Sequence, residues 1–148
     1  MHAVSAAMLR PQFTTLDERR EKYNKRYYAF KDKLNALDGV EVPEQLPEVT
    51  IVGDSIQFNL KEASMEQIKA FQKATLDRGL LVELFGDTTN ARYFKNWEFA
   101  PADCELPQTE RIIKSTLDMR MPLTWEDSDF DDMYNVLVES MTDAGILK

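Results

Sequence analysis

The segment Gly86–Phe99 combines a guanidinium, two side-chain amides and four aromatic rings in one stretch. An arginine offers a planar fork that suits a carboxylate or a phosphate. Aromatic side chains can wall a pocket or stack on a flat ring. The candidate ligand-binding residues are Arg92, Asn90, Tyr93, Asn96 and Trp97. A structural alternative stays open, in which the aromatics fill the core beneath a long loop and Arg92 pairs with a local acid.

Other chemistry is poorly supported along the chain. The acidic run 126–132 lacks the glycine and the closing glutamate of a calcium loop, so we expect carboxylates clustered at a helix N-terminus. Cys104 has no histidine nearby in sequence, and we expect a small, semi-buried apolar side chain rather than a nucleophile. With His2 as its one histidine, the chain does not predict a metal site. No catalytic residue is predicted.

Composition restricts the class of protein. The length of 148 residues fits one domain, residues 1–148. A net charge of −8 argues against binding nucleic acid or an anionic membrane surface. No apolar run reaches the length of a membrane span, and a single cysteine is typical of a reducing compartment. The expected location is therefore cytoplasmic.

The hydrophobic pattern predicts alternating helices and strands. Apolar residues at three- and four-residue steps predict helices at 15–37, 64–78 and 127–142, and Pro107 opens a shorter one over 108–116. Thr14 is expected to cap the first helix, and Ser64 with Gln67 forms a capping-box pattern. Strands are expected at Ile56–Leu60 and Leu81–Phe85, with further extended runs at 49–52 and 118–125.

These elements predict an α+β fold. The expected architecture is a small β-sheet covered by helices mainly on one face, preceded by a long interdomain helix. The residues between Val40 and Pro47 are expected to form an irregular connection, and Gly39 to take a left-handed conformation after the first helix. The directions of the strands are left open.

Four stretches of the chain resemble one enzyme family. They are the opening run from Ser5 to Arg20, the segment 52–60, Phe85–Gly86 with 90–93, and 118–123. Together they are similar to the C-terminal small domain of fold-type-I PLP-dependent aminotransferases, specifically the DegT-like (StrS-type) family. The resemblance implies transfer of an amino group from an amino acid to a keto acceptor, such as a nucleotide-linked keto-sugar.

The resemblance also implies what this chain lacks. In that family pyridoxal phosphate binds a lysine of a large domain, so the chain alone is expected to bind no cofactor and to be inactive. Its expected partners are that large domain, upstream or on a separate chain, and a second copy in a homodimer. The 86–99 loop would reach the substrate between the domains, with Arg92 as the cation.

A second interpretation remains open, in which the chain is a free-standing α+β ligand-binding or protein-interaction module without catalysis. Under the aminotransferase interpretation, the apolar residues Met8, Leu9 and Phe13 should lie exposed on a face that the chain alone cannot cover. The isolated chain should then associate with itself or bind a hydrophobic dye.

Overall fold

The computed structural model describes residues 2–101, 103 and 105–148. The expectation for Cys104 lies outside the described residues. The elements, in chain order, are α1 (Ala3–Leu9), the 3₁₀ helix η1 (Arg10–Thr15), α2 (Leu16–Asn35), β1 (Val40–Glu41), β2 (Ser55–Leu60), α3 (Met65–Asp77), β3 (Glu83–Leu84), the 3₁₀ helix η2 (Phe94–Asn96), α4 (Pro107–Ile113), β4 (Thr116–Arg120) and α5 (Asp127–Asp143).

The strands form one antiparallel sheet in the order β1-β2-β4-β3. Ile56 of β2 pairs with Met119 of β4, and Leu84 of β3 pairs with Leu117 of β4. β4 therefore lies between β2 and β3, which run in the same direction. The strands β2 and β3, which are joined through α3, are not neighbours in the sheet, because β4 lies between them.

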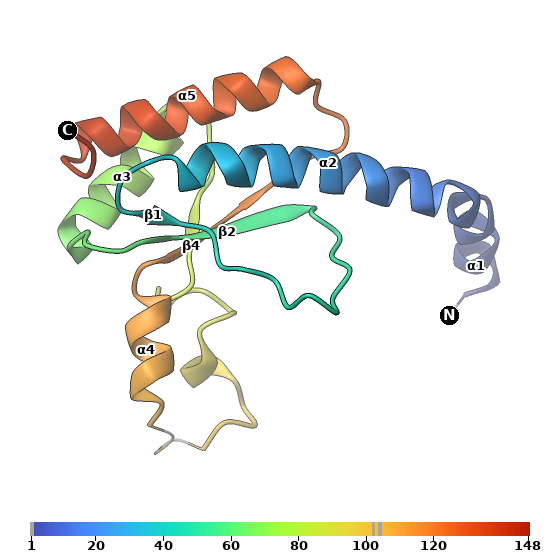
Figure 1. The fold of residues 1–148 in the computed structure, drawn as a ribbon. Coiled ribbons are helices and arrows are strands. Elements are labelled where there is room, and N and C mark those ends of the chain that lie inside the picture. The colour runs from blue at the N-terminus through green and yellow to red at the C-terminus, as the bar shows by residue number, and fades with distance from the viewer. Residues whose placement is uncertain (1, 102, 104) are drawn as a thin grey trace.

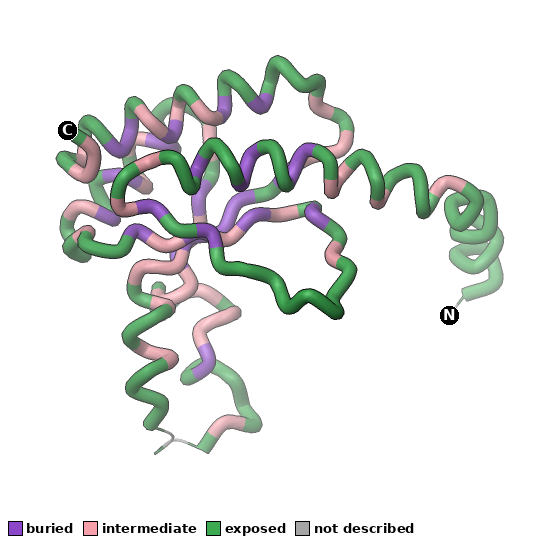
Figure 2. The backbone as a smooth tube through the Cα atoms, viewed as in Figure 1, coloured by how far each residue is buried: buried purple, intermediate pink, exposed green. Residues whose placement is uncertain are grey.

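Helices α2, α3 and α5 cover one face of this sheet (Figure 1). Ile56, Phe58 and Leu60 alternate with polar residues along β2 and are buried against the helices. The ring of Phe58 meets that of Phe71 from α3 edge to face at 6.5 Å, and Phe30 of α2 meets Phe130 of α5 in the same way. The buried residues are concentrated between the helices and the sheet (Figure 2), which confirms the predicted α+β class.

The N-terminal arm, residues 3–16, projects beyond this domain (Figure 1). It comprises α1, η1 and the first residue of α2, and neither α1 nor η1 has a buried residue. Met8, Leu9 and Phe13 are exposed as expected. No helix of the described residues is both long and apolar enough to span a membrane.

Some local predictions were correct and others wrong. Ser64 and Gln67 form the predicted capping box, and Gly39 has a φ of 75°. Thr14 does not cap the long helix, because its hydroxyl donates to Pro11 O instead. The run 49–52 is not a strand.

A side chain of α2 explains the conformation of that run. Asn24 donates to Ile51 O at 2.9 Å and accepts from Gly53 N at 3.0 Å, so it takes the backbone groups that a neighbouring strand would use. In the preceding connection, which was expected to be irregular, Val40 and Glu41 form the edge strand β1.

Candidate functional site

Arg92 lies on the face of the sheet opposite the three long helices. Its guanidinium donates to Asp118 Oδ2 at 2.6 Å and to Glu83 Oε2 at 3.1 Å. It also lies over the ring of Phe85, 5.2 Å from the ring centroid. Arg92 thus attaches the loop that follows β3 to the middle of the sheet.

The acceptors of Arg92 belong to a polar row across the sheet. The register places Gln57 of β2 opposite Asp118 of β4, and Asp118 opposite Glu83 of β3. Gln57 donates to the other carboxylate oxygen of Asp118 at 2.5 Å. Asp118 is only 2% exposed, so its carboxylate needs hydrogen-bond donors from the protein. Gln57 and Arg92 provide one donor for each of its two oxygens.

The other candidate residues mainly hold the loop together. Asn90 accepts from Arg92 N and donates to Leu84 O, and Asn96 donates to the carbonyls of Thr88 and Asn90. The indole of Trp97 donates to Ala91 O at 3.0 Å. Their amide and indole groups are thus used within the loop.

The aromatic residues of the loop divide into a buried and an exposed set. Phe94 is buried, and Tyr93 beside it is half-buried. Trp97 and Phe99 are exposed, and their rings are stacked at 5.3 Å. The structure therefore places Arg92 and the two asparagines in structural contacts, and leaves Trp97 and part of Tyr93 accessible to a ligand.

The electrostatics at Arg92 favour anchoring over anion binding. One guanidinium faces the carboxylates of Asp118 and Glu83, so the three groups sum to one negative charge. The hydrogen bond to Asp118 raises the pKa of Arg92 above its ordinary value, and burial opposes this shift. A substrate carboxylate at this guanidinium would therefore lie close to two acids of its own charge.

The polar row of Gln57, Asp118 and Glu83 is partly visible in the alternation of polar and apolar residues along the strands. Gln57 and Asp118 each alternate with apolar residues on their strands, so both belong to the sheet face away from the core. Their pairing depends on residues 61 positions apart in the chain. A hollow of about 220 Å³ adjoins the row, lined by Glu83, Asp118 and neighbours that include Arg120 and Trp125.

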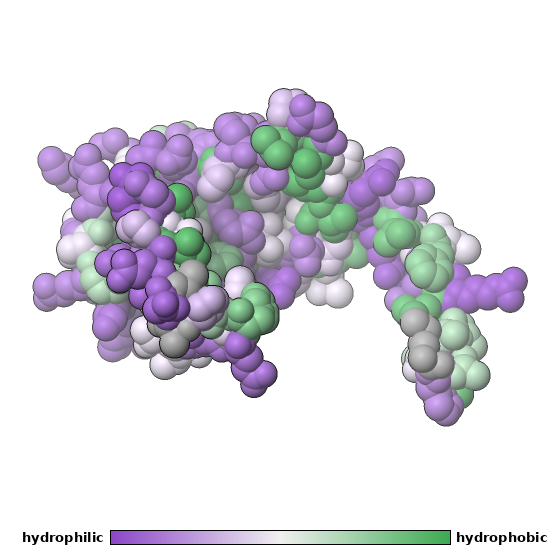
Figure 3. All heavy atoms as spheres, turned by 90° about the horizontal axis from the view of Figure 1, so that it is seen from below, coloured by the Kyte–Doolittle hydropathy of each residue, from purple (hydrophilic) through white to green (hydrophobic). Residues whose placement is uncertain are grey.

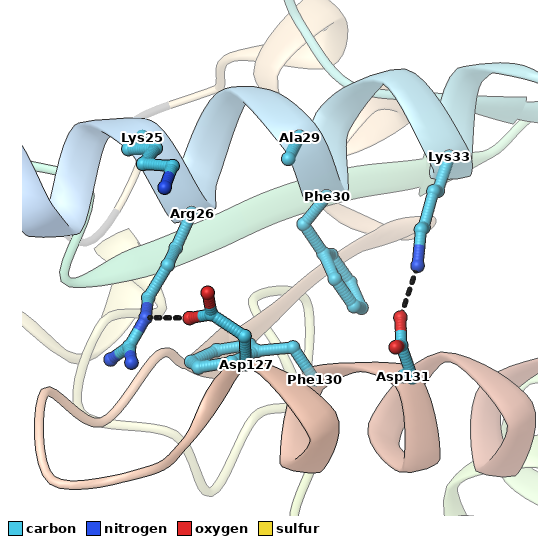
Figure 4. A pocket seen from close by; sticks show the side chains of 8 residues that line it. All are labelled: Lys25, Arg26, Ala29, Phe30, Lys33, Asp127, Phe130 and Asp131. Carbon is cyan, nitrogen blue, oxygen red and sulfur yellow. Dashed lines mark hydrogen bonds and ion pairs between the residues drawn. The ribbon is translucent and has the colours of Figure 1, made fainter.

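A second hollow of about 180 Å³ lies between α2 and α5 (Figure 4). Phe30 and Phe130 form its floor, and ion pairs bound its two ends, Arg26 with Asp127 and Lys33 with Asp131. Arg26 also donates to Leu123 O at 3.1 Å. Lys25 also lines this hollow, which therefore combines an aromatic floor with charged side chains at its rim.

The acidic run at the start of α5 is a helix terminus, as predicted. Glu126 accepts from the Asp129 backbone while the Asp129 carboxylate accepts from Glu126 N at 2.7 Å, which forms a reciprocal cap. Within residues 2–101, 103 and 105–148, no group of three or more histidine, cysteine or acidic side chains is placed to hold a metal ion.

Comparison with known proteins identifies the fold. The chain is similar to the aminotransferase TlmJ from Streptoalloteichus hindustanus, with a TM-score of 0.75 and 18% identity over 94% of this chain and 36% of that one. It is also similar to 3-amino-5-hydroxybenzoic acid synthase, with a TM-score of 0.72 and 18% identity over 93% of this chain and 38% of that one.

A third solved structure is DesI in the presence of its TDP-sugar product, with a TM-score of 0.67 and 16% identity over 88% of this chain and 33% of that one. The chain thus has the fold of part of these proteins and spans roughly a third of their length. No family model matches the sequence, and no curated protein matches it.

Proposed function

We propose that the chain is the C-terminal portion of a PLP-dependent aminotransferase of the DegT-like type. The observation that carries this proposal is the fold match, which takes in 94% of this chain but only 36% of an aminotransferase. The four sequence segments that resemble the family support the same assignment. The proposed acceptor is a keto-sugar linked to a nucleotide, and the donor is an amino acid.

The cofactor would belong to another part of the protein. Pyridoxal phosphate acts as an electron sink once it is joined to a lysine. Such a lysine needs a lowered pKa, whereas ion pairing with Glu44 and Glu110 raises the pKa values of Lys31 and Lys95. Lys33, Lys61 and Lys73 are also ion-paired. These five lysines are therefore poorly suited to form a Schiff base, which supports the proposal of a separate PLP-binding domain.

We propose the 86–99 loop as this chain's contribution to the substrate site. Trp97 and Tyr93 would form its wall, with Asn90, Asn96 and Arg92 behind them. The contacts of Arg92 support a positioning role, because its guanidinium is already bound to Asp118 and Glu83. Direct contact of Arg92 with a substrate carboxylate stays a prediction.

The size of the native polypeptide tests the proposal. An antiserum raised against the 17.1 kDa chain should detect, in cells of the source organism, a polypeptide about three times as large. A band at 17.1 kDa without any larger band would instead support a free-standing module. A split enzyme would give the small band in a complex that co-purifies with a PLP-binding chain.

A further inference from the structure

The hollow between α2 and α5 is an aromatic pocket at the surface of the helical layer (Figure 4). The rings of Phe30 and Phe130 meet edge to face at 6.5 Å and form its floor. Ala29 leaves the space above them open, because it carries a single methyl group between the long side chains of Lys25 and Lys33 on the same stripe of α2. An apolar space of about 150 Å³ accommodates one benzene ring. The hollow, at about 180 Å³, is therefore large enough for a small aromatic group.

The rim of this hollow carries more positive than negative charge, although the chain as a whole has a net charge of −8. Three cations and two anions line it, so the rim sums to +1: Lys25, Arg26, Lys33, Asp127 and Asp131. Arg26 is bound to Asp127, and Lys33 to Asp131. Lys25 is exposed and takes part in none of the ion pairs of the described residues, although Glu21 lies one turn before it on α2. Its ammonium is therefore available to an anion.

The guanidinium of Arg26 is fixed in place, in contrast to the Lys25 ammonium. Its Nε donates to Asp127 Oδ1 at 3.1 Å, and its Nη1 donates to Leu123 O at 3.1 Å. The guanidinium also lies 4.9 Å from the centroid of the Phe130 ring, and the residue is only 8% exposed. Arg26 therefore forms a rigid end of the hollow, and Lys25 is the cation that can turn towards a ligand.

We infer that this hollow binds a small aromatic carboxylate. The flat ring would lie over Phe30 and Phe130 in the space that Ala29 leaves open, and the carboxylate would accept a hydrogen bond from the Lys25 ammonium. One negative charge on the ligand offsets the charge of +1 on the rim, which disfavours a cationic ligand. The inference does not rest on the proposed function, because α2 and α5 cover the face of the sheet opposite Arg92.

The hollow is separate from the apolar surface of the N-terminal arm. Seen from below the sheet, the arm extends from the domain as a limb that carries hydrophobic residues (Figure 3). The arm ends at Leu16, and Lys25 lies roughly 13 Å further along α2 at 1.5 Å per residue. No residue of the arm lines the hollow. A contact that covers the arm would therefore leave the hollow open to a ligand.

Fluorine NMR of 4-fluorobenzoate, titrated with the full chain, provides the first test. We expect saturable binding with a Kd of about 1 mM, as is typical of so small a ligand. Two further probes separate the charge from the ring. The amide 4-fluorobenzamide keeps the ring without the charge, and fluoroacetate keeps the carboxylate without the ring. Each should bind about fivefold more weakly than 4-fluorobenzoate or less tightly still.

Ala29→Leu tests the location of the site. The larger side chain would fill the space over Phe30, so the binding of 4-fluorobenzoate should be lost. Leucine is a good helix former and Ala29 is exposed, so the variant should keep its fold, which circular dichroism checks. Ala70→Leu is the matched control, because Ala70 is an exposed alanine of α3 that does not line the hollow. It should bind the probe as the unmodified chain does.

Substitutions of Lys25 test the role of its charge. Lys25→Gln should weaken the binding of 4-fluorobenzoate about fivefold and leave that of 4-fluorobenzamide unchanged. Lys25→Glu changes the charge of the rim from +1 to −1, so this variant should prefer 4-fluorobenzylamine, whose ammonium is positive. A reversed preference would not follow from a general loss of structure. Lys22→Gln, at an exposed position of α2 outside the hollow, is the control.

Two results would overturn the inference. One is the absence of saturable binding of 4-fluorobenzoate up to about 10 mM, tenfold above the expected Kd. The other is binding that persists in Ala29→Leu, or that responds equally to Lys25→Gln and Lys22→Gln. If Ala29→Leu lost its fold, the Lys25 variants alone would decide. Neither result affects the proposed aminotransferase function, which the size of the native polypeptide tests separately.

Discussion

At the scale of single residues, Asp118 decides how the candidate site is built. Its carboxylate is buried in the centre of the sheet and would be costly there without donors. Gln57 and Arg92 supply them, so the guanidinium that was expected to meet a substrate is the counterion of a buried acid. Arg92 therefore both stabilises the fold and holds the 86–99 loop against the sheet.

Arg92→Ala should lower the free energy of unfolding by about 1–3 kcal/mol, because it leaves the buried Asp118 with a single donor. Arg92→Lys should recover only part of this loss, since an ammonium cannot span Asp118 and Glu83 with a fork. Urea unfolding measures both variants. Arg111→Ala, at an exposed position of α4, is the control.

An Arg92→Ala chain as stable as the original would contradict the anchoring role. If substrate binding is the main role, the substitution in the complete enzyme should instead raise KM by roughly ten- to a hundredfold without a loss of stability, as expected for a lost charge-assisted pair.

Asp87 makes the start of the loop sensitive to acid. The Thr89 backbone N–H and then its hydroxyl donate to Asp87 Oδ1, and these bonds lower the pKa of Asp87 below its ordinary value of 3.8. Because the pKa is lower in the folded state, the stabilising contribution is complete above pH 3.8 and disappears as pH falls through the folded-state pKa.

An NMR titration of the Asp87 carboxyl should therefore give a midpoint below 3.8. Asp87→Asn should unfold with a weaker dependence on pH in this acidic range than the original chain. A midpoint at or above 3.8 would show that the two bonds from Thr89 do not persist in solution.

At the scale of elements, the sequence predicted those with a clear burial period. Strand β2 and helices α2, α3 and α5 were found close to their expected ranges, because alternation and three- to four-residue steps report which side meets the core. The expected strand at Leu81–Phe85 contains the two residues of β3. Strand β1 was not predicted, because two residues are too few to show such a period.

The order of the strands could not be predicted, because it depends on contacts between distant residues. Nothing local to Ser55–Leu60 indicates that Thr116–Arg120 pairs with it. The 86–99 loop could be identified as a candidate site from its composition, which is a local feature. The buried partner of Arg92 could not be identified, because this pairing is a long-range contact. The alternative in which Arg92 pairs with a local acid was open, and Glu83, nine residues away, is such an acid. The buried acid, Asp118, lies 26 residues away and could not be identified from the sequence.

Gly53→Ala tests how the 46–52 loop is held against α2. A Cβ at Gly53 would collide with Cβ of Tyr27, a residue that is 3% exposed and cannot move freely. We expect a loss of about 1–3 kcal/mol in the free energy of unfolding, as for other overpacked sites. Thr50→Ala, at an exposed position of the same loop, should change little. Equal stability of the two variants would show that the loop is not held closely.

At the scale of the whole molecule, the chain is one sheet with helices on one face, an arm at one end and a polar row on the other face. Its fold corresponds to about a third of the length of the aminotransferases that it resembles. The proposal that the chain functions together with further protein would account for the uncovered arm, in which neither α1 nor η1 has a buried residue.

Trapping of pyridoxal phosphate on the native protein tests this account most directly. The protein would be purified from its source, reduced with borohydride to fix the cofactor on its lysine, digested, and mapped by mass spectrometry. The account predicts a tagged lysine in a peptide outside these 148 residues, on the same polypeptide or on a co-purifying chain. A tag on one of the lysines of this sequence, or a native protein that contains these residues and takes up no pyridoxal phosphate, would contradict it.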